Sequence, residues 1–195
     1  MKALKSHYHH GDLRATLVEA AVRLLETEGI DALSIRRLAE LTGVSRAAPY
    51  HHFQDKRELL CAIAEAGFVQ QEATLTALED LQGRERIEQF VHTYVSFATQ
   101  HREQYDLMYG REIWKNSGAT TSLEVVAKQC FKRWLSEVTA LQAQSILNNN
   151  LPAVRVAQVS WAALHGLCRL INDGIYADDA DIEAMEASLV AMLVS

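Results

Sequence analysis

The feature that most constrains this chain is the spacing of its apolar residues, which recur three and four positions apart along almost its whole length. This spacing gathers apolar side chains on one face of an α-helix, whereas no segment shows the strict alternation of a half-buried strand. Only two prolines, Pro49 and Pro152, interrupt the pattern. The sequence therefore predicts an all-α fold of about nine helices.

Capping and breaking residues divide the pattern into separate helices. Gly29 is expected to end the first helix, Ser34 and Ser45 to cap two short ones, and Gly43 to form the turn between them. The helices are expected at residues 12–28, 35–41, 45–53, 56–78, 84–100, 102–109, 121–143, 152–173 and 179–194. We expect a helix-turn-helix DNA-binding domain at 1–55 and a helical effector-binding and dimerisation domain at 56–195, joined through the helix that begins at Lys56.

Composition excludes several classes of protein. The sequence contains no run of about 18 apolar residues, the length that would indicate a membrane span. No membrane partner is therefore expected. The start of the chain is polar and lacks the apolar stretch of a secretory signal. Three widely separated cysteines, Cys61, Cys130 and Cys168, fit neither a disulfide framework nor a zinc site. A cytoplasmic location, no metal and no cofactor are expected, and no nucleophile or phosphate-loop motif points to an enzyme.

Residues 34–53 carry the strongest functional pattern. Two short helices joined by a glycine turn are typical of a helix-turn-helix, whose second helix can enter the major groove of DNA. The first 60 residues hold nine Lys/Arg against eight Asp/Glu, while the remaining 135 hold ten against seventeen. An anionic partner should therefore meet the first third of the chain. Alone, the pattern also fits a helical hairpin with a solvated charged face.

Pro49 falls inside the expected second helix. Counted from Ser45 as N-cap, it occupies the fourth helical position, where we expect it to cost little and to stiffen the helix start.

The stretch from Leu13 to Leu60 resembles the TetR (tetracycline-repressor-like) family of regulators. The resemblance rests on Ala20-Ala21, Leu24-Leu25, Gly29, Ser34 to Ala39, Gly43 to Ser45, Tyr50 to Phe53 and Lys56 to Leu60, which match in order and spacing. Tyr8 to Arg14 and the element Trp161-x-x-x-His165-Gly166 resemble one subgroup of this family.

The resemblance implies a three-helix DNA-binding domain and a larger helical domain that dimerises and often binds a small molecule. The family's DNA contacts carry over onto Arg36, Arg46, Ala47, Ala48, Tyr50, His51, His52 and Lys56. Tyr50 and Lys56 match phosphate contacts, whereas Arg36 and Arg46 match positions that read bases. Pro49 stands where the family usually has a residue other than proline.

A set of aromatic, sulfur-containing and histidine side chains in the second domain is the candidate effector pocket, and it is equally compatible with a packed core or a dimer seam. Its members are Tyr105, Met108, Tyr109, Trp114, Cys130, Trp134, Trp161 and His165.

Together these features predict a ligand-responsive transcriptional regulator, most simply a repressor. It would bind a palindromic operator as a homodimer through the helices at about 152–173 and 179–194, and an unknown small molecule would release it. Val154, Ala157, Trp161, Leu164 and Cys168 are the expected dimer stripe on the first of these helices. The alternative is a helical small-molecule-binding or scaffold protein that does not bind DNA.

Overall fold

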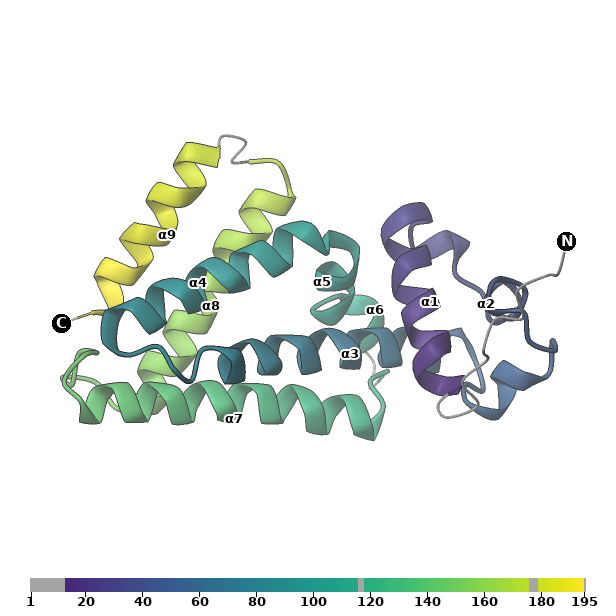
Figure 1. Ribbon diagram of the computed structural model, residues 1–195, viewed down its shortest axis with the longest axis horizontal. Helices are drawn as coiled ribbons and strands as arrows, with labels where there is room; N and C mark the ends of the chain where they lie inside the picture. The colour runs from purple at the N-terminus through teal and green to yellow at the C-terminus, as the bar shows by residue number, and fades with distance from the viewer. Residues whose placement is uncertain (1–12, 116–117, 176–178, 195) are drawn as a thin grey trace, which may run out of the picture.

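The structure, a computed structural model, describes residues 13–115, 118–175 and 179–194 and confirms the all-α prediction (Figure 1). Within these ranges the only strand-like pairing is one isolated bridge between Leu147 and Val194. The α-helices are α1 (Leu13–Glu28), α2 (Ile35–Thr42), α3 (Lys56–Ala77), α4 (Gly83–Gln100), α5 (Arg102–Met108), α6 (Arg111–Trp114), α7 (Thr121–Ala143), α8 (Ala153–Asn172) and α9 (Asp179–Leu193). The predicted helices agree with these bounds to within one or two residues, except at 45–53, and α6 was not predicted.

Local capping explains several helix starts. Ser34 accepts a hydrogen bond from Arg37 N, Asp55 from Glu58 N and Thr120 from Leu123 N. Each side chain satisfies an amide that has no partner within the first turn of its helix. Residue 12, where we expected the first helix to begin, lies outside the described residues.

The predicted α-helix at 45–53 is wrong. Residues Ala48–His51 instead form a short 3₁₀ helix, η2, flanked by turns. Pro49 has no amide proton to give to Ser45 O, four residues earlier, and that oxygen accepts from Ala48 N at 3.0 Å. The three-residue spacing repeats from Tyr50 N to Ala47 O at 3.2 Å. Pro49 therefore sets the type of helix rather than merely stiffening its start.

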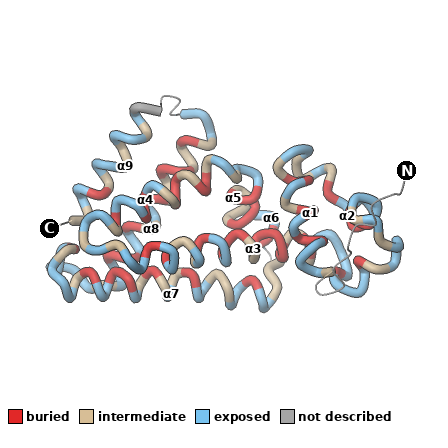
Figure 2. Tube along the Cα trace, in the orientation of Figure 1, coloured by how far each residue is buried: buried red, intermediate tan, exposed pale blue. Residues whose placement is uncertain are grey.

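The helices form two lobes (Figure 1). The head contains α1, α2 and η2, and the body contains the helices from α4 onwards. Helix α3 runs from the head into the body, where it packs most extensively against α7 and α5. Figure 2 shows buried positions along one side of most helices, and the buried apolar side chains form one continuous cluster through both lobes. None of the described helices is both long and apolar enough to cross a bilayer.

Polar contacts fix the head against the body. Glu26 of α1 accepts a hydrogen bond from Gln104 N at the start of α5, at 3.0 Å. Arg57 donates to Gly118 O at 2.8 Å. Because α1 contacts both α3 and α5, a shift of either body helix would move the head.

Candidate nucleic-acid interface and interior cavity

The helix-turn-helix is built from α2, the turn at Gly43 and η2. Gly43 adopts φ 69°, a left-handed conformation that glycine reaches without steric cost. Its neighbour Val44 donates to Ala39 O at 3.1 Å, which closes the end of α2. The turn directs the chain away from α2 and so presents Arg46 and the residues of η2 on a separate surface.

Two buried rings hold the second half of the motif in place. Pro49 and Phe53 are buried, and the guanidinium carbon of Arg14 lies 5.8 Å from the centre of the Phe53 ring. Between these anchors Tyr50 is 55% exposed, and both histidines that follow it are exposed. The polar side chains of this segment therefore face solvent while its apolar ones hold the backbone.

Each of the predicted contact residues is exposed, except that Ala48 is half-buried. Arg36 is paired with Glu40 of its own helix, with 3.3 Å between Nε and Oε1. In the part of the chain that the structure describes, Arg46 makes no ion pair or hydrogen bond through its side chain. Residues 34–56 hold four Lys/Arg against two acidic residues. The surface thus has a cationic excess, and Arg46 is its least engaged guanidinium.

Lys56 has a structural contact that the sequence did not predict. Its Nζ donates to Ile30 O, 2.8 Å away, and so ties the start of α3 to the short 3₁₀ helix Ile30–Ala32 that follows α1. In addition, Asp55 already accepts one amide of the first turn of α3, and Glu58 accepts from Gln54 N at 2.8 Å. A phosphate at this helix start would meet the Lys56 ammonium rather than a fully vacant set of amides.

The interior candidates divide into three groups. Tyr105, Tyr109, Trp161 and His165 come together between α5 and α8, where the rings of Tyr109 and His165 lie 4.5 Å apart. Cys130 and Trp134 lie nearby on α7. Met108 and Trp114 lie apart from both cavities described below. Met108 is buried against Gly67, where an added methyl would collide with its sulfur, and Trp114 Nε1 donates to Met108 O at 2.6 Å.

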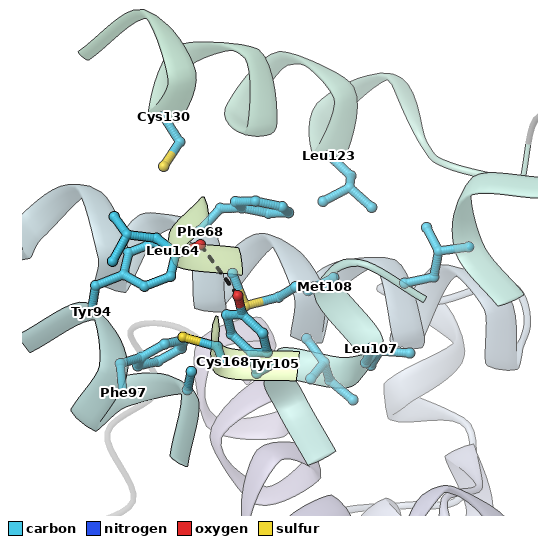
Figure 3. Packing of buried hydrophobic residues seen from close by; sticks show 14 of the residues in the cluster. Phe68, Tyr94, Phe97, Tyr105, Leu107, Met108, Leu123, Cys130, Leu164 and Cys168 are labelled. Atoms are coloured by element: carbon cyan, nitrogen blue, oxygen red, sulfur yellow. Dashed lines mark hydrogen bonds between the residues drawn. The ribbon is translucent and has the colours of Figure 1, made fainter. Parts of the chain in front are cut away.

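A chain of polar groups crosses the interior of the body. Tyr94 contacts Tyr105 through their hydroxyls, 3.3 Å apart, as the dashed line in Figure 3 shows. Tyr94 also bonds Tyr109 at 3.2 Å and accepts from Trp161 Nε1 at 3.0 Å. At one end of this series of hydrogen bonds, the Tyr105 hydroxyl contacts His165 Nδ1 at 2.8 Å. At the other end, the Tyr109 hydroxyl donates to Gln71 Oε1 at 3.2 Å. Helices α3, α4, α5 and α8 are thereby connected through side chains.

Burial keeps these groups uncharged. It raises the pKa of Tyr94, Tyr105 and Tyr109 well above the ordinary value and raises the pKa of the Cys130 thiol to about 12. Burial, and then the charge of Arg169, lowers the pKa of His165 from 6.5. Neutral phenols and a neutral imidazole are therefore expected near pH 7.

Two cavities adjoin this series of hydrogen bonds, and Trp161 lines both of them. One is a small, partly enclosed chamber of about 20 Å³, room for about one water molecule. It is lined by Gln71, Leu75, Phe90, Tyr94, Cys130, Trp134, Trp161 and Leu164. The other is an open pocket of about 390 Å³, lined by Tyr109, Phe131, Gln158, Trp161, Ala162 and His165. Pockets of this size commonly accommodate small ligands.

Sequence reasoning missed Gln71 and Tyr94. Gln71 is the one polar side chain in the series Ala64, Phe68, Gln71 and Leu75 along the buried face of α3. A polar residue within an apolar helical stripe is a recognisable signal. Tyr94 follows Phe90 by one turn on the buried face of α4, so its spacing alone predicts an ordinary core residue.

A larger groove of about 490 Å³ lies elsewhere, between α1 and α3 at the junction of head and body. Its walls carry Arg14, Glu19, Arg23 and Glu65, and it is open to solvent. The mixed charges of its walls distinguish it from the aromatic pocket in the body.

Stability should fall as the pH drops below 6.5, in part because of His165. The unfolded chain takes up a proton on this residue at a higher pH than the folded protein does, so acid favours unfolding. Urea unfolding at pH 7.5 and 5.5 should show a smaller loss for His165→Gln than for the wild type. The exposed His51→Gln is the control and should keep the wild-type loss; equal losses in all three proteins would contradict the assignment.

The arrangement defines a class of protein: an all-helical body joined by one long helix to a head that presents a helix-turn-helix. Residues 17–63 match the model of the bacterial regulatory proteins of the tetR family, and residues 87–193 match the tetracyclin repressor-like C-terminal domain. The chain belongs to the TetR family, whose members are transcriptional regulators rather than enzymes. Neither description refers to Trp161, His165 and Gly166, so the subgroup remains a prediction.

Individual proteins match part of the sequence or share the whole fold. The class A tetracycline repressor of transposon 1721 from Escherichia coli is 51% identical over 51 residues, which are 26% of this chain and 24% of that repressor. The chain thus matches about a quarter of the length of this curated relative. A protein of unknown function from Rhodococcus sp. RHA1 is 34% identical, with a TM-score of 0.81, over 98% of this chain and 100% of that one. The TetR family regulator PfmR from Thermus thermophilus shares the fold at 19% identity, with a TM-score of 0.65, over 90% and 97%.

Proposed function

We propose that this protein is a ligand-responsive transcriptional repressor that binds a palindromic operator as a homodimer and is released by a small molecule. The observation that carries the proposal is the exposed, cationic surface of the helix-turn-helix, held in place by buried Pro49 and Phe53. The class A tetracycline repressor, which matches a quarter of this chain, is a repressor by name.

Each part of the surface has a separate role in this proposal. Arg46 reads a base, because its guanidinium is uncommitted and can bond both O6 and N7 of a guanine. Tyr50 and Lys56 hold phosphates, which positions the head without reading sequence. Arg36, Ala47, Ala48, His51 and His52 complete the contact surface.

Dimerisation would use α8 and α9, but a different face of α8 from the one we expected. Ala157, Leu164 and Cys168 are buried within the protomer and cannot face a partner. The outward face of α8 instead carries Val159, Ala163 and Gly166, and space around Gly166 is open. Two copies joined here as a four-helix bundle would present two heads about 34 Å apart, one turn of DNA.

Release by a ligand requires only a modest energetic preference. A molecule in the body that favours a different position of α3 would change the spacing of the two heads. A preference of about 1–3 kcal/mol would weaken DNA binding about 5- to 150-fold.

The experiment that tests the proposal compares two head variants on selected DNA. Genomic fragments retained by the purified protein are first identified and then used in mobility-shift titrations at two salt concentrations. Arg46→Ala should relax selectivity by about 1–3 kcal/mol at one base position. Lys56→Ala should weaken binding to all sequences alike and reduce the salt dependence, with some loss of stability because Ile30 O loses its donor.

Lys132→Ala, at an exposed position of α7, is the matched control and should leave DNA binding unchanged. Failure of the wild-type protein to retain any fragment in a salt-sensitive, sequence-selective way would overturn the proposal. It would favour a helical ligand-binding or scaffold protein instead.

A further inference from the structure

The hydrogen-bonded series of side chains in the body has a donor-to-acceptor direction, which follows from counting the protons that each group can donate. With the Gln71 amide oriented so that Oε1 faces Tyr109, Tyr109 uses its only hydroxyl proton on this oxygen and accepts its bond from Tyr94. Tyr94 has then used its own proton and accepts from Trp161 Nε1 and from Tyr105. Tyr105 in turn must accept from His165 Nδ1. The five side chains from His165 to Gln71 therefore form a one-way series of donors.

This direction fixes the tautomer of His165. A neutral imidazole holds one proton, and the series places it on Nδ1, so Nε2 carries a lone pair. Among the described residues no group hydrogen-bonds Nε2. The two ring nitrogens point away from each other, so Nε2 faces away from buried Tyr105, and His165 forms part of the wall of the open pocket. The pocket therefore offers a hydrogen-bond acceptor.

At the other end of the series it is a hydrogen-bond donor that lacks a partner. Gln71 is 6% exposed and lines the small chamber, and its Nε2 has no partner within the described part of the chain. A buried donor without an acceptor is costly. The amide thus holds the whole series in one direction through Oε1 while its other atom has no protein partner.

The walls of the open pocket are aromatic and without a fixed charge. Phe131 and Trp161 are stacked, with ring centres 5.2 Å apart and planes at 12°. Of the lining residues only His165 titrates near neutral pH, and burial lowers its pKa. Arg169, one turn away, is already paired with Asp106 and Asp173. Nothing on the lining would neutralise a charged ligand.

We propose that the open pocket binds a neutral, planar aromatic alcohol, such as a phenol or naphthol, whose hydroxyl donates to His165 Nε2. The ring lies against Trp161 and Phe131, and the bond at His165 extends the donor series by one member. This inference names the ligand class of the effector site, so it rests on the proposed function only for its regulatory consequence.

The first test uses two probes that differ only in the donor. Binding of 2-naphthol and 2-methoxynaphthalene to the wild-type protein is measured by quenching of tryptophan fluorescence and by calorimetry. The naphthol should bind about tenfold more tightly, because its ether analogue leaves Nε2 unpaired and cannot donate. 2-Naphthoate should bind more weakly than 2-naphthol because the lining offers no counter-charge.

The second test reverses the series. Gln71→Leu removes the acceptor of Tyr109. Tyr109 should then donate its proton to Tyr94, and Tyr94 should donate to Tyr105. Tyr105 should in turn donate to His165 Nδ1. Nε2 of His165 then carries the proton, and the preference should change to the methoxy probe. Gln129→Leu, at an exposed position of α7 that lines neither cavity and lies outside the series, is the matched control and should keep the wild-type preference.

Three results with the wild-type protein would overturn the proposal: equal affinities for the two probes, tighter binding of the ether, or no binding of either probe at about 1 mM ligand. That concentration is on the order of the weakest ordinary affinities. An unchanged preference in a folded Gln71→Leu protein, as judged by circular dichroism, would also overturn it. Should that variant not fold, the comparison of probes on the wild type still decides. DNA retention without any probe tests the regulator proposal separately, so the failure of one is distinguishable from failure of the other.

Discussion

Glu137→Ala should lower the free energy of unfolding by about 3 kcal/mol, because it strands the charge of Arg86 inside the body. Both side chains are nearly buried, with 12% of Arg86 and 11% of Glu137 exposed, and Arg86 Nη2 lies 2.9 Å from Glu137 Oε2. Arg86 also donates to Leu78 O at 2.6 Å, so it cannot turn to solvent without leaving a second group unpaired. The pair joins α4 to α7 beneath the end of α3.

The measurement is urea unfolding followed by circular dichroism at one fixed protomer concentration. In thermal unfolding followed by the same signal, the melting temperature should fall by about 6–12 °C for a chain of this length. Glu88→Ala is the matched control, since Glu88 pairs with Arg84 of the same helix at 2.7 Å but with half of each side chain exposed. It should cost less than about 0.5 kcal/mol. A similar loss in both variants would show that Arg86–Glu137 is no stronger than a surface pair.

Local sequence signals were enough to predict most of the fold. Apolar spacing identified the helices, and capping residues such as Ser34 and Thr120 explain where two of them begin, since both signals act within one or two turns. The second helix of the motif was mispredicted because the spacing of apolar residues does not register a missing amide proton. At Pro49 that single absent donor changes the hydrogen-bond pattern of the whole segment.

The interior site was less predictable because it depends on which helices meet. Tyr109, Trp161 and His165 were expected near a pocket and do lie around one. Trp114 was grouped with them by composition alone, yet its indole is committed to Met108 O. Gln71 and Tyr94 come from α3 and α4, and only the packing of those helices against α5 and α8 brings them to the same polar chain.

Val159→Glu should abolish dimerisation and lower operator affinity by about 10²- to 10⁴-fold, the largest effect expected for a single substitution in this chain. Val159 is 65% exposed on the outward face of α8. Across a two-fold axis the new carboxylate of one protomer would face the same carboxylate of the other. Both carboxylates would also lose their hydration where the two helices approach. A monomer binds only one half-site, so the gain from holding two heads at a fixed spacing disappears.

Light scattering during gel filtration should report one protomer's mass for the variant and two for the wild type. Affinity for an isolated half-site should stay the same in both, because the head is untouched. Val125→Glu, at a 47% exposed valine of α7, provides the matched control and should remain dimeric. A Val159→Glu protein that stays dimeric would move the interface elsewhere on the body. A monomer with undiminished affinity for the full operator would mean that the two heads do not act together, and the palindromic mode of binding would have to be abandoned.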